Sequence, residues 1–189
     1  MLSWVKNDVR RAAFLRLLSP GPNDKILDVG AGKGDVAALV QQTGSCDVYA
    51  LDPDEKRIGL AQKMHRNVKV CVGGSESIPY EGGFFDKVYS TMAVHHFADQ
   101  EKSFKEIARV LRSGGVLVVL DISSRSFLGR LGGFLGSAVM RSHLRFLNRD
   151  ELVAMLGREG EFVVKEAKES GQGYFVQAIK VAGSSQPMP

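Results

Sequence analysis

Three glycines follow a short apolar run near the start of the chain, and their spacing could hold a nucleotide cofactor. Residues 26 to 29 read Ile-Leu-Asp-Val, and glycines stand at positions 30, 32 and 34. Glycine adopts positive φ and lets the backbone approach a ligand closely at little cost. The loop can therefore lie against an adenosyl group. Asp28 adds a carboxylate beside the turn, which suits a cationic or hydroxyl-bearing ligand and repels a pyrophosphate.

The spacing of these glycines differs from the dinucleotide fingerprint G-x-G-x-x-G. A fingerprint that begins at Gly30 requires its third glycine at position 35, where the chain has Asp35. The third glycine instead stands at position 34. Together with the carboxylate of Asp28, this spacing disfavours NAD as the ligand.

A second candidate, Asp52, closes the apolar run 46–51 about 20 residues after the glycine loop. A carboxylate at the end of the second strand can accept hydrogen bonds from both ribose hydroxyls. The alternative is that Asp52 caps a helix that starts near Pro53, because Asp-Pro is a common helix start. Both roles are compatible.

Two further strand ends carry weaker signals. Residues 73–80 begin with Gly73-Gly74-Ser75-Glu76, where small residues permit an adenine to lie flat on the backbone, although a surface turn has the same composition. The predicted strand 85–90 leads to His95 and His96, either of which could accept a proton or orient a substrate. Packing or a helix start explains these histidines equally well.

These residues must be positioned by an α/β sheet. Apolar periodicity predicts a first helix over residues 4–18, after which strand-like and helix-like runs alternate, as in a parallel sheet covered on both faces. The expected strands are 25–30, 46–51, 68–72, 85–90 and 115–121, and the expected helices are 34–42, 54–65, 99–111 and 148–156. Gly114 and Gly115 are expected to cap the helix 99–111. Runs 161–168 and 173–181 predict an antiparallel hairpin that closes the sheet.

Composition limits the possible classes of protein. The 189 residues suit one domain, residues 1–183, with the tail 184–189 expected to be disordered. Two cysteines lie in apolar runs without a partner at metal-ligand spacing, so we expect no disulfide and no metal site, and a cytoplasmic protein. No window approaches a membrane span, and the first residues lack a signal-peptide core. The chain is therefore expected to be soluble.

Positive charge is concentrated in one segment. The net charge is only +4, but no acidic residue lies between Asp121 and Asp150, a stretch that contains five arginines. This segment, residues 122–149, is also rich in glycine with scattered Phe and Leu, and a family resemblance, carried by the motifs named next, implies that it caps a substrate pocket. It could be a lid over an apolar acceptor, an interfacial helix at an anionic membrane surface, or a loosely packed cap with solvated arginines.

The motifs together resemble the class I S-adenosylmethionine-dependent methyltransferases, particularly the small-molecule group with the ubiquinone/menaquinone C-methyltransferases. The resemblance spans roughly residues 24–122. It rests on Ile26–Gly34 as the first motif, Ala50-Leu51-Asp52 as the second, residues 75–80 with 85–88 as the third region, and Glu106–Gly115 as the helix and turn before the fifth strand. It implies a Rossmann-like sheet of order 3-2-1-4-5-7-6 with strand 7 antiparallel and helices on both faces.

The resemblance also implies S-adenosylmethionine as cofactor. Asp28 and the glycine loop would hold its methionine moiety, Asp52 its ribose, and the backbone around Ser75 its adenine. The implied cofactor-binding residues are Asp28, Gly30, Ala31, Gly32, Gly34, Asp52, Pro53, Gly74, Ser75, Glu76, Thr91 and Met92. Many relatives have Asp where this chain has Gly74, so Glu76 or a backbone carbonyl must replace that contact.

The implied activity is methyl transfer to a small or lipid-like acceptor, achieved mainly by proximity and orientation. His95 and His96 are the candidate bases. A non-catalytic S-adenosylmethionine-binding module is the alternative from another class, since a module can keep the cofactor pocket without an acceptor site. An RNA-directed methyltransferase is less favoured, because Ser90-Thr91-Met92-Ala93 stands where amino-directed nucleic-acid enzymes carry an Asn/Asp-Pro-Pro-Tyr/Phe tetrapeptide.

Overall fold

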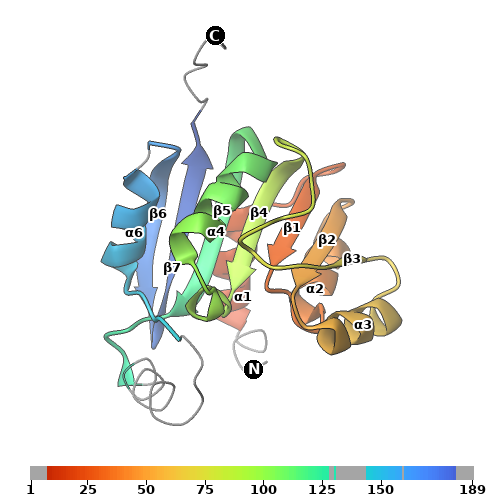
Figure 1. The fold of residues 1–189 in the computed structure, drawn as a ribbon, viewed down its shortest axis with the longest axis horizontal. Coiled ribbons are helices and arrows are strands. Elements are labelled where there is room, and N and C mark those ends of the chain that lie inside the picture. Colours follow the sequence, from red (N-terminus) through yellow and green to blue (C-terminus); the bar gives the residue numbers. More distant parts are fainter. Residues whose placement is uncertain (1–7, 128–129, 131–143, 159, 182–189) are drawn as a thin grey trace.

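The computed structural model describes residues 8–127, 130, 144–158 and 160–181. Its centre is a seven-stranded sheet of order β3-β2-β1-β4-β5-β7-β6 (Figure 1). The strands are β1 (Lys25–Val29), β2 (Asp47–Asp52), β3 (Lys69–Val72), β4 (Phe85–Thr91), β5 (Leu111–Ile122), β6 (Phe162–Ser170) and β7 (Gly173–Lys180). Strand β7 runs antiparallel to both of its neighbours, and β1 to β5 pair in parallel. The predicted order and orientation are confirmed.

Helices cover both faces of this sheet. The helices are α1 (Asp8–Leu18), α2 (Asp35–Thr43), α3 (Glu55–Met64), α4 (Gln100–Val110) and α6 (Arg149–Gly157), with a 3-10 turn, η1 (Val94–His96), after β4. Apolar residues of α4 and α6 pack on one face, whereas those of α1, α2 and α3 pack on the other. Strands β1, β2, β4 and β5 are largely buried, which explains their nearly continuous apolar runs, whereas the edge strand β3 is partly exposed.

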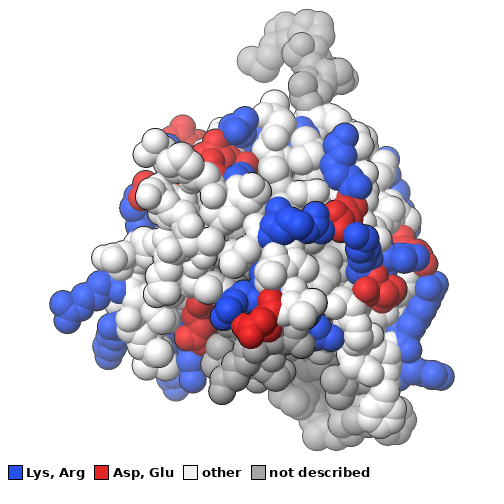
Figure 2. Space-filling view, turned by 180° about the vertical axis from the view of Figure 1, so that it is seen from behind, with Lys and Arg blue, Asp and Glu red and all other residues white. Residues whose placement is uncertain are grey.

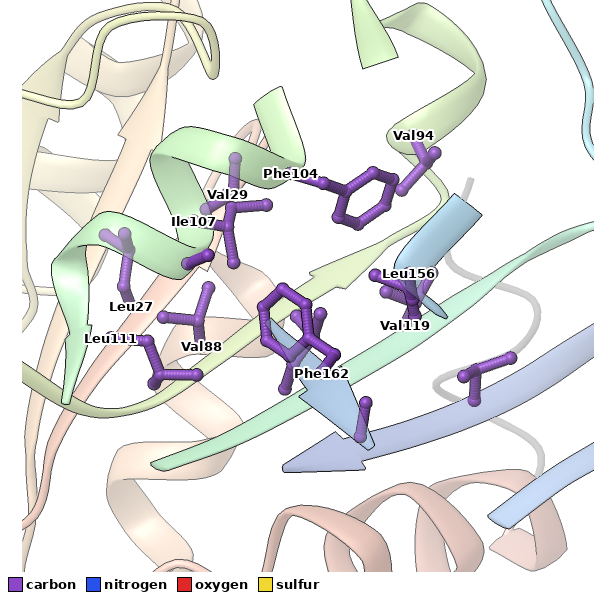
Figure 3. Packing of buried hydrophobic residues seen from close by; sticks show 14 of the residues in the cluster. Leu27, Val29, Val88, Val94, Phe104, Ile107, Leu111, Val119, Leu156 and Phe162 are labelled. Atoms are coloured by element: carbon purple, nitrogen blue, oxygen red, sulfur yellow. The ribbon is translucent and has the colours of Figure 1, made fainter. Parts of the chain in front are cut away.

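Side-chain alternation along β1 divides its residues between the two faces. Leu27 and Val29 lie in the core under α4, where Figure 3 shows them near Phe104 and Ile107. Ile26, on the other face, packs with α1 and α2. The pleat therefore directs Asp28 to the face of Ile26, away from α4.

The predicted cap of the helix before the fifth strand is wrong. Helix α4 ends at Val110, and β5 already begins at Leu111, so Gly114 and Gly115 lie inside the strand. The pairing of β4 with β5 shifts register there, and Gly114 has φ +74°. A Cβ on Gly115 would lie 2.8 Å from the carbonyl oxygen of Arg112. The glycines are required by this irregularity in the strand rather than by the end of the helix.

At the two ends of the chain, the structure supports the predictions where it describes them. Residues 4–7 of the predicted first helix and the tail 184–189 lie outside the described residues. Strands β6 and β7 form the predicted antiparallel hairpin around a turn at 171–172, where Gly171 has φ +61°. No helix in the described part of the chain is long and apolar enough to cross a membrane.

Charges on the described surface are largely mixed in sign. On the face shown in Figure 2, Lys and Arg groups lie among Asp and Glu groups. Several of the basic side chains form ion pairs, such as Arg112 with Asp86 and Lys69 with Asp47. Most of the arginine-rich segment 122–149, namely 128–129 and 131–143, lies outside the described residues.

Candidate functional site

An open cavity of about 430 Å³ lies beyond the carboxyl ends of β1, β2, β3 and β4. This is the end of a parallel sheet at which ligands of doubly wound folds bind. The lining comprises Val29, Gly30, Leu51, Asp52, Pro53, Asp54, Arg57, Gly73, Gly74, Ser75, Glu76, Met92, Ala93, His96, Phe97 and Ala98. Its volume falls in the range of small-molecule and cofactor pockets.

The glycine loop forms one wall of this cavity, and its three glycines have positive φ of +81°, +57° and +75°. Gly30 must be glycine for a second reason, because a Cβ there would lie 2.4 Å from the Cβ of Ala93. A Cβ on Gly34 would similarly lie 3.0 Å from the Cβ of Ala61 in α3. A Cβ on Gly32, in contrast, would meet no atom within 4 Å. Gly30 and Gly34 permit close packing, whereas Gly32 leaves open space beside the loop.

Asp52 connects the end of β2 to this loop. Its carboxylate accepts hydrogen bonds from the Gly32 amide at 2.8 Å and from the Asp54 amide at 3.0 Å. The carboxylate is almost fully buried but still borders the cavity. The alternative role as a helix cap is wrong, because Asp54 caps α3 by accepting from the Lys56 and Arg57 amides. The cap of α3 is therefore Asp54, one residue after Pro53, and Asp52 remains at the cavity.

The loop after β3 contributes Glu76 to the opposite wall. One carboxylate oxygen of Glu76 accepts from the amides of Ala98 and Asp99, at 2.9 and 3.3 Å. The other oxygen lies 3.0 Å from the position of a Cβ on Gly74. Glu76 therefore occupies the space beside Gly74. The Ser75 hydroxyl faces Ser103 of α4 at 2.9 Å instead.

Met92, at the end of β4, is one of three non-glycine residues with positive φ in the described chain, at +55°. Such a conformation costs free energy and persists where the surroundings fix it. The Met92 amide donates to the Leu120 carbonyl of β5 at 2.8 Å, and the next residue, Ala93, packs against Gly30. The unusual backbone places Met92 in the cavity wall, whereas Thr91 stays buried in the strand.

The two histidines differ in their surroundings. His96 is exposed and lines the cavity, whereas His95 is buried. Partial burial and the nearby His95 lower the pKa of His96. The two rings lie 4.2 Å apart between centroids. A neutral imidazole therefore stands at the cavity, which is the form that accepts a proton.

A buried carboxylate holds His95. Asp121, at the end of β5, lies 2.6 Å from Nδ1 of His95, and its second oxygen accepts from the His95 backbone amide at 3.0 Å. The Ile122 amide donates to the first oxygen at 2.7 Å. Because both oxygens already accept backbone amides, the network assigns the Nδ1 proton to His95. Asp121 was not predicted: 26 positions separate it from His95, and only parallel pairing of β4 with β5 brings them together.

Known proteins match this chain over the same elements. A model of a methyltransferase domain matches residues 27–119. A demethylmenaquinone methyltransferase of Thermotoga maritima is 27% identical over 182 residues, covering 85% of this chain and 80% of that protein. The chain belongs to the class I S-adenosylmethionine-dependent methyltransferases.

Two further comparisons show how far the similarity extends. A sarcosine/dimethylglycine N-methyltransferase of Halorhodospira halochloris is 34% identical over 107 residues, which cover 53% of this methyltransferase and 38% of that protein. A geranyl diphosphate methyltransferase solved in complex with S-adenosylmethionine superimposes with a TM-score of 0.77 at 17% identity, covering 92% of this chain and 85% of that one. The latter similarity concerns the fold.

The geometry of this methyltransferase fits its cofactor, S-adenosylmethionine. The cavity borders Gly30 of the glycine loop and the carboxylate of Asp52, so it offers both room and an acceptor group beside the loop. Of the residues predicted for the site, the cavity lining contains Gly30, Asp52, Pro53, Gly74, Ser75, Glu76, Met92 and His96. Those outside the lining are Asp28, Ala31, Gly32, Gly34, Thr91 and His95.

Asp28 lies apart from the cavity wall. Its side chain is fully buried on the α1 and α2 face, where the Tyr89 hydroxyl donates to it at 3.0 Å. Burial raises the pKa of Asp28 to about 8. Its other oxygen has no hydrogen-bond partner among the described residues. Because side chains alternate along β1, Asp28 lies on the same face as Ile26. The alternation can be read from the sequence, but the glycine motif does not indicate it.

Proposed function

We propose that this methyltransferase transfers a methyl group to a small or lipid-like acceptor that binds beside His96. The observation that carries the proposal is the open cavity that has Asp52 on one wall and a neutral His96 on another. Residues 1–183 would form a single domain, and residues 122–149 would cover the acceptor. Residues 144–148 of this segment lie at the histidine turn, because the Arg145 amide donates to the His95 carbonyl at 3.1 Å.

Each wall of the cavity would hold one part of the cofactor. Asp52 would accept from the ribose hydroxyls, and Glu76 with the backbone at Gly74 and Ser75 would surround the adenine. The glycine loop, Gly30 to Gly34, would contact the methionine moiety. Asp28 is buried outside the cavity lining, so no direct contact with the cofactor is proposed for it. Bound S-adenosylmethionine supplies an electrophilic methyl group on a sulfonium. Met92, near Thr91, would face this group from the end of β4.

The chain's own residues would contribute orientation and proton removal. Holding two reactants in attack geometry can supply about 7–11 kcal/mol of the barrier. His96 would accept the proton that leaves the acceptor's nucleophilic oxygen or carbon as the new bond to the methyl group forms. Asp121 would keep His95 in one tautomer, and the His95 ring would hold His96 in place at 4.2 Å.

Apolar surroundings support a lipid-like acceptor. Met92, Ala93 and Phe97 line the cavity around His96. The Thermotoga maritima relative is named for a demethylated menaquinone, whereas the Halorhodospira relative is named for sarcosine and dimethylglycine. The first similarity covers 85% of the chain and the second 53%. We therefore favour the prenylated aromatic acceptor over the small amine.

Calorimetry tests the cofactor part of this proposal. S-adenosylhomocysteine should bind the purified protein, and NAD should not bind, because the loop lacks the dinucleotide spacing. Binding of NAD with no binding of S-adenosylhomocysteine would overturn the assignment.

Turnover tests the acceptor part. The protein is incubated with labelled S-adenosylmethionine and either a short-chain demethylnaphthoquinol or sarcosine, and labelled product is counted. Methylation of the quinol is expected. Binding of S-adenosylhomocysteine without turnover of either acceptor would favour a non-catalytic module.

Liposome co-sedimentation tests a peripheral membrane contact of the segment 122–149. Within the described part of this segment, Phe127 is 72% exposed, and Arg125 and Arg130 are exposed as well. Vesicles with anionic lipid should retain the protein more than neutral vesicles do. Absence of binding to both would leave the segment as a cover for the acceptor alone.

A further inference from the structure

A short stretch of chain, residues 144–148, returns over the histidine turn immediately before α6. The Arg145 amide donates to the His95 carbonyl at 3.1 Å, and Leu147 is buried. Ser124, which follows β5, donates its amide to the Leu147 carbonyl at 3.2 Å. The stretch is therefore held at the turn by backbone hydrogen bonds from two sides.

Gln100, the first residue of α4, bridges the stretch and the turn. Its side-chain nitrogen donates to the Val94 carbonyl at 3.0 Å and to the Arg145 carbonyl at 2.7 Å. Only the amide nitrogen of this side chain can donate to two carbonyls, so the orientation of the amide follows from the network. Gln100 is 3% exposed, and its oxygen has no partner among the described residues. A buried unpaired oxygen costs free energy, so packing alone does not favour glutamine here.

Phe146 covers the ring of His95. The two rings are nearly parallel, with 12° between their planes and 4.6 Å between their centroids. Asp121 already holds the edge of this imidazole at Nδ1, and the His96 ring lies 4.2 Å away. Two segments outside the turn, β5 through Asp121 and the stretch 144–148 through Phe146, therefore fix the orientation of His95.

We propose that Gln100 and Phe146 are positioning residues for methyl transfer, because they fix the His95 ring and, through it, His96 at the cavity. The inference rests on the proposed role of His96. Neither residue lines the cofactor cavity, so both should act on the rate of transfer rather than on cofactor affinity. A displacement of about 1 Å at a reacting group can lower a rate by roughly 100-fold, so loosening of this contact should be measurable.

The test uses the full chain with Gln100→Met and Phe146→Ala. Gln100→Met removes both donated hydrogen bonds with little change in volume, and Phe146→Ala removes the stacked ring. We expect kcat with the methylated acceptor to fall by about 10-fold in each variant, with KM for S-adenosylmethionine and the affinity for S-adenosylhomocysteine nearly unchanged. Phe146→Tyr keeps the stacked ring and should restore kcat.

A matched control is available at Gln177. Its side chain donates to the Leu17 carbonyl at 2.6 Å, far from the site on β7. Gln177→Met removes a side-chain hydrogen bond of the same kind from a half-buried residue, and it should leave kcat unchanged. A similar loss of kcat in Gln177→Met and Gln100→Met would indicate general destabilisation and would contradict a positioning role.

Amide hydrogen exchange of the apo protein tests the contact without turnover. The backbone amides of Arg145 and His95, which donate to the His95 carbonyl and to Asp121, should exchange about 10-fold faster in Gln100→Met and Phe146→Ala than in the wild type. Unchanged exchange in both variants would overturn the inference even if the proposed function holds. Conversely, a wild-type protein that binds no S-adenosylhomocysteine would contradict the proposed function, while the exchange rates still decide whether these residues fix His95.

Discussion

The wall of the cavity beside β1 and β2 is formed largely by backbone, whereas the histidine turn on the opposite wall is held from behind by side chains of separate segments. On the first wall, glycine φ values, a close approach to Ala93 and amides directed at Asp52 define the shape. On the second, His95 depends on Asp121 and Phe146, which are 26 and 51 positions away. A local motif can specify the first wall, but only tertiary structure can assemble the second.

Gly30→Ala should have the largest effect, because the backbone-built wall tolerates no Cβ there. Positive φ and the 2.4 Å approach to the Ala93 Cβ both oppose the substitution. We expect the free energy of unfolding to fall by about 2–5 kcal/mol, measured by urea denaturation. Gly32→Ala, which has open space, is the control and should cost about 1–2 kcal/mol. Equal losses would contradict the difference between the two glycines.

Asp28→Asn should change how stability depends on pH. Burial raises the pKa of Asp28 to about 8, well above the ordinary value of an aspartate, so the folded state retains a proton that the unfolded state loses. Stability from this group is complete below the unfolded pKa and is lost as pH rises toward 8. The wild type should therefore lose about 3 kcal/mol relative to Asp28→Asn between pH 5 and pH 8.

Thermal unfolding of both proteins across this pH range provides the measurement. Asp86→Asn is a useful control, because the Lys25 amide and Arg112 hold the pKa of that carboxyl below its usual value. Its stability contribution is present above the unfolded pKa and is lost as pH falls. Parallel pH profiles for wild type and Asp28→Asn would show that Asp28 is not protonated in the fold.

Asp52→Asn should weaken S-adenosylhomocysteine binding by about 100-fold in calorimetry. Both oxygens accept backbone amides, so an amide nitrogen must face an N–H group in one of the two positions, and the ribose loses a charged acceptor. Asp47→Asn, at the opposite end of β2, removes an exposed ion pair with Lys69 and should bind normally. Equal affinity for all three proteins would contradict the role of Asp52.

Substitutions on the side-chain-built wall should have smaller effects on binding and clear effects on rate. His96→Ala should lower kcat by about 100-fold, since general base catalysis typically contributes that much or more. His95→Ala and Asp121→Ala should lower kcat by about 10-fold through loss of orientation. S-adenosylhomocysteine affinity should remain nearly unchanged in all three. Full rates in both histidine variants would remove the base hypothesis.

The sequence predicted most of the fold because each element carries its own local signal. Apolar runs of four to seven residues between glycine or proline breaks located the strands, and resemblance to a family supplied their order. The glycines at 114 and 115 were misplaced because a chain reversal after a helix and an irregular strand use the same residue type. Only the pairing of β4 with β5 distinguishes these two uses.

The site was predictable in proportion to how locally it is built. Asp52 was identified from its distance to the glycine loop, and the structure places it at the cavity. Arg57, Phe97 and Ala98 also line the cavity, but no spacing in the sequence indicates it. Asp121 is the last but one residue of β5, much as Asp52 is the last residue of β2, so its position near a strand end was the one signal that could have drawn attention to it.

The position of Asp121 has a consequence for how acceptor preference can be exchanged between relatives. The family model matches residues 27–119 and ends two residues before Asp121. The matched residues therefore include most of the cavity lining and both histidines. Asp121 and Phe146, which contact His95, lie outside them. A chimera joined within β5, after Val119, would keep residues 1–119 of this chain and take the remaining residues from a relative with another acceptor. The residues taken from the relative must then supply a carboxylate in the place of Asp121 to hold His95.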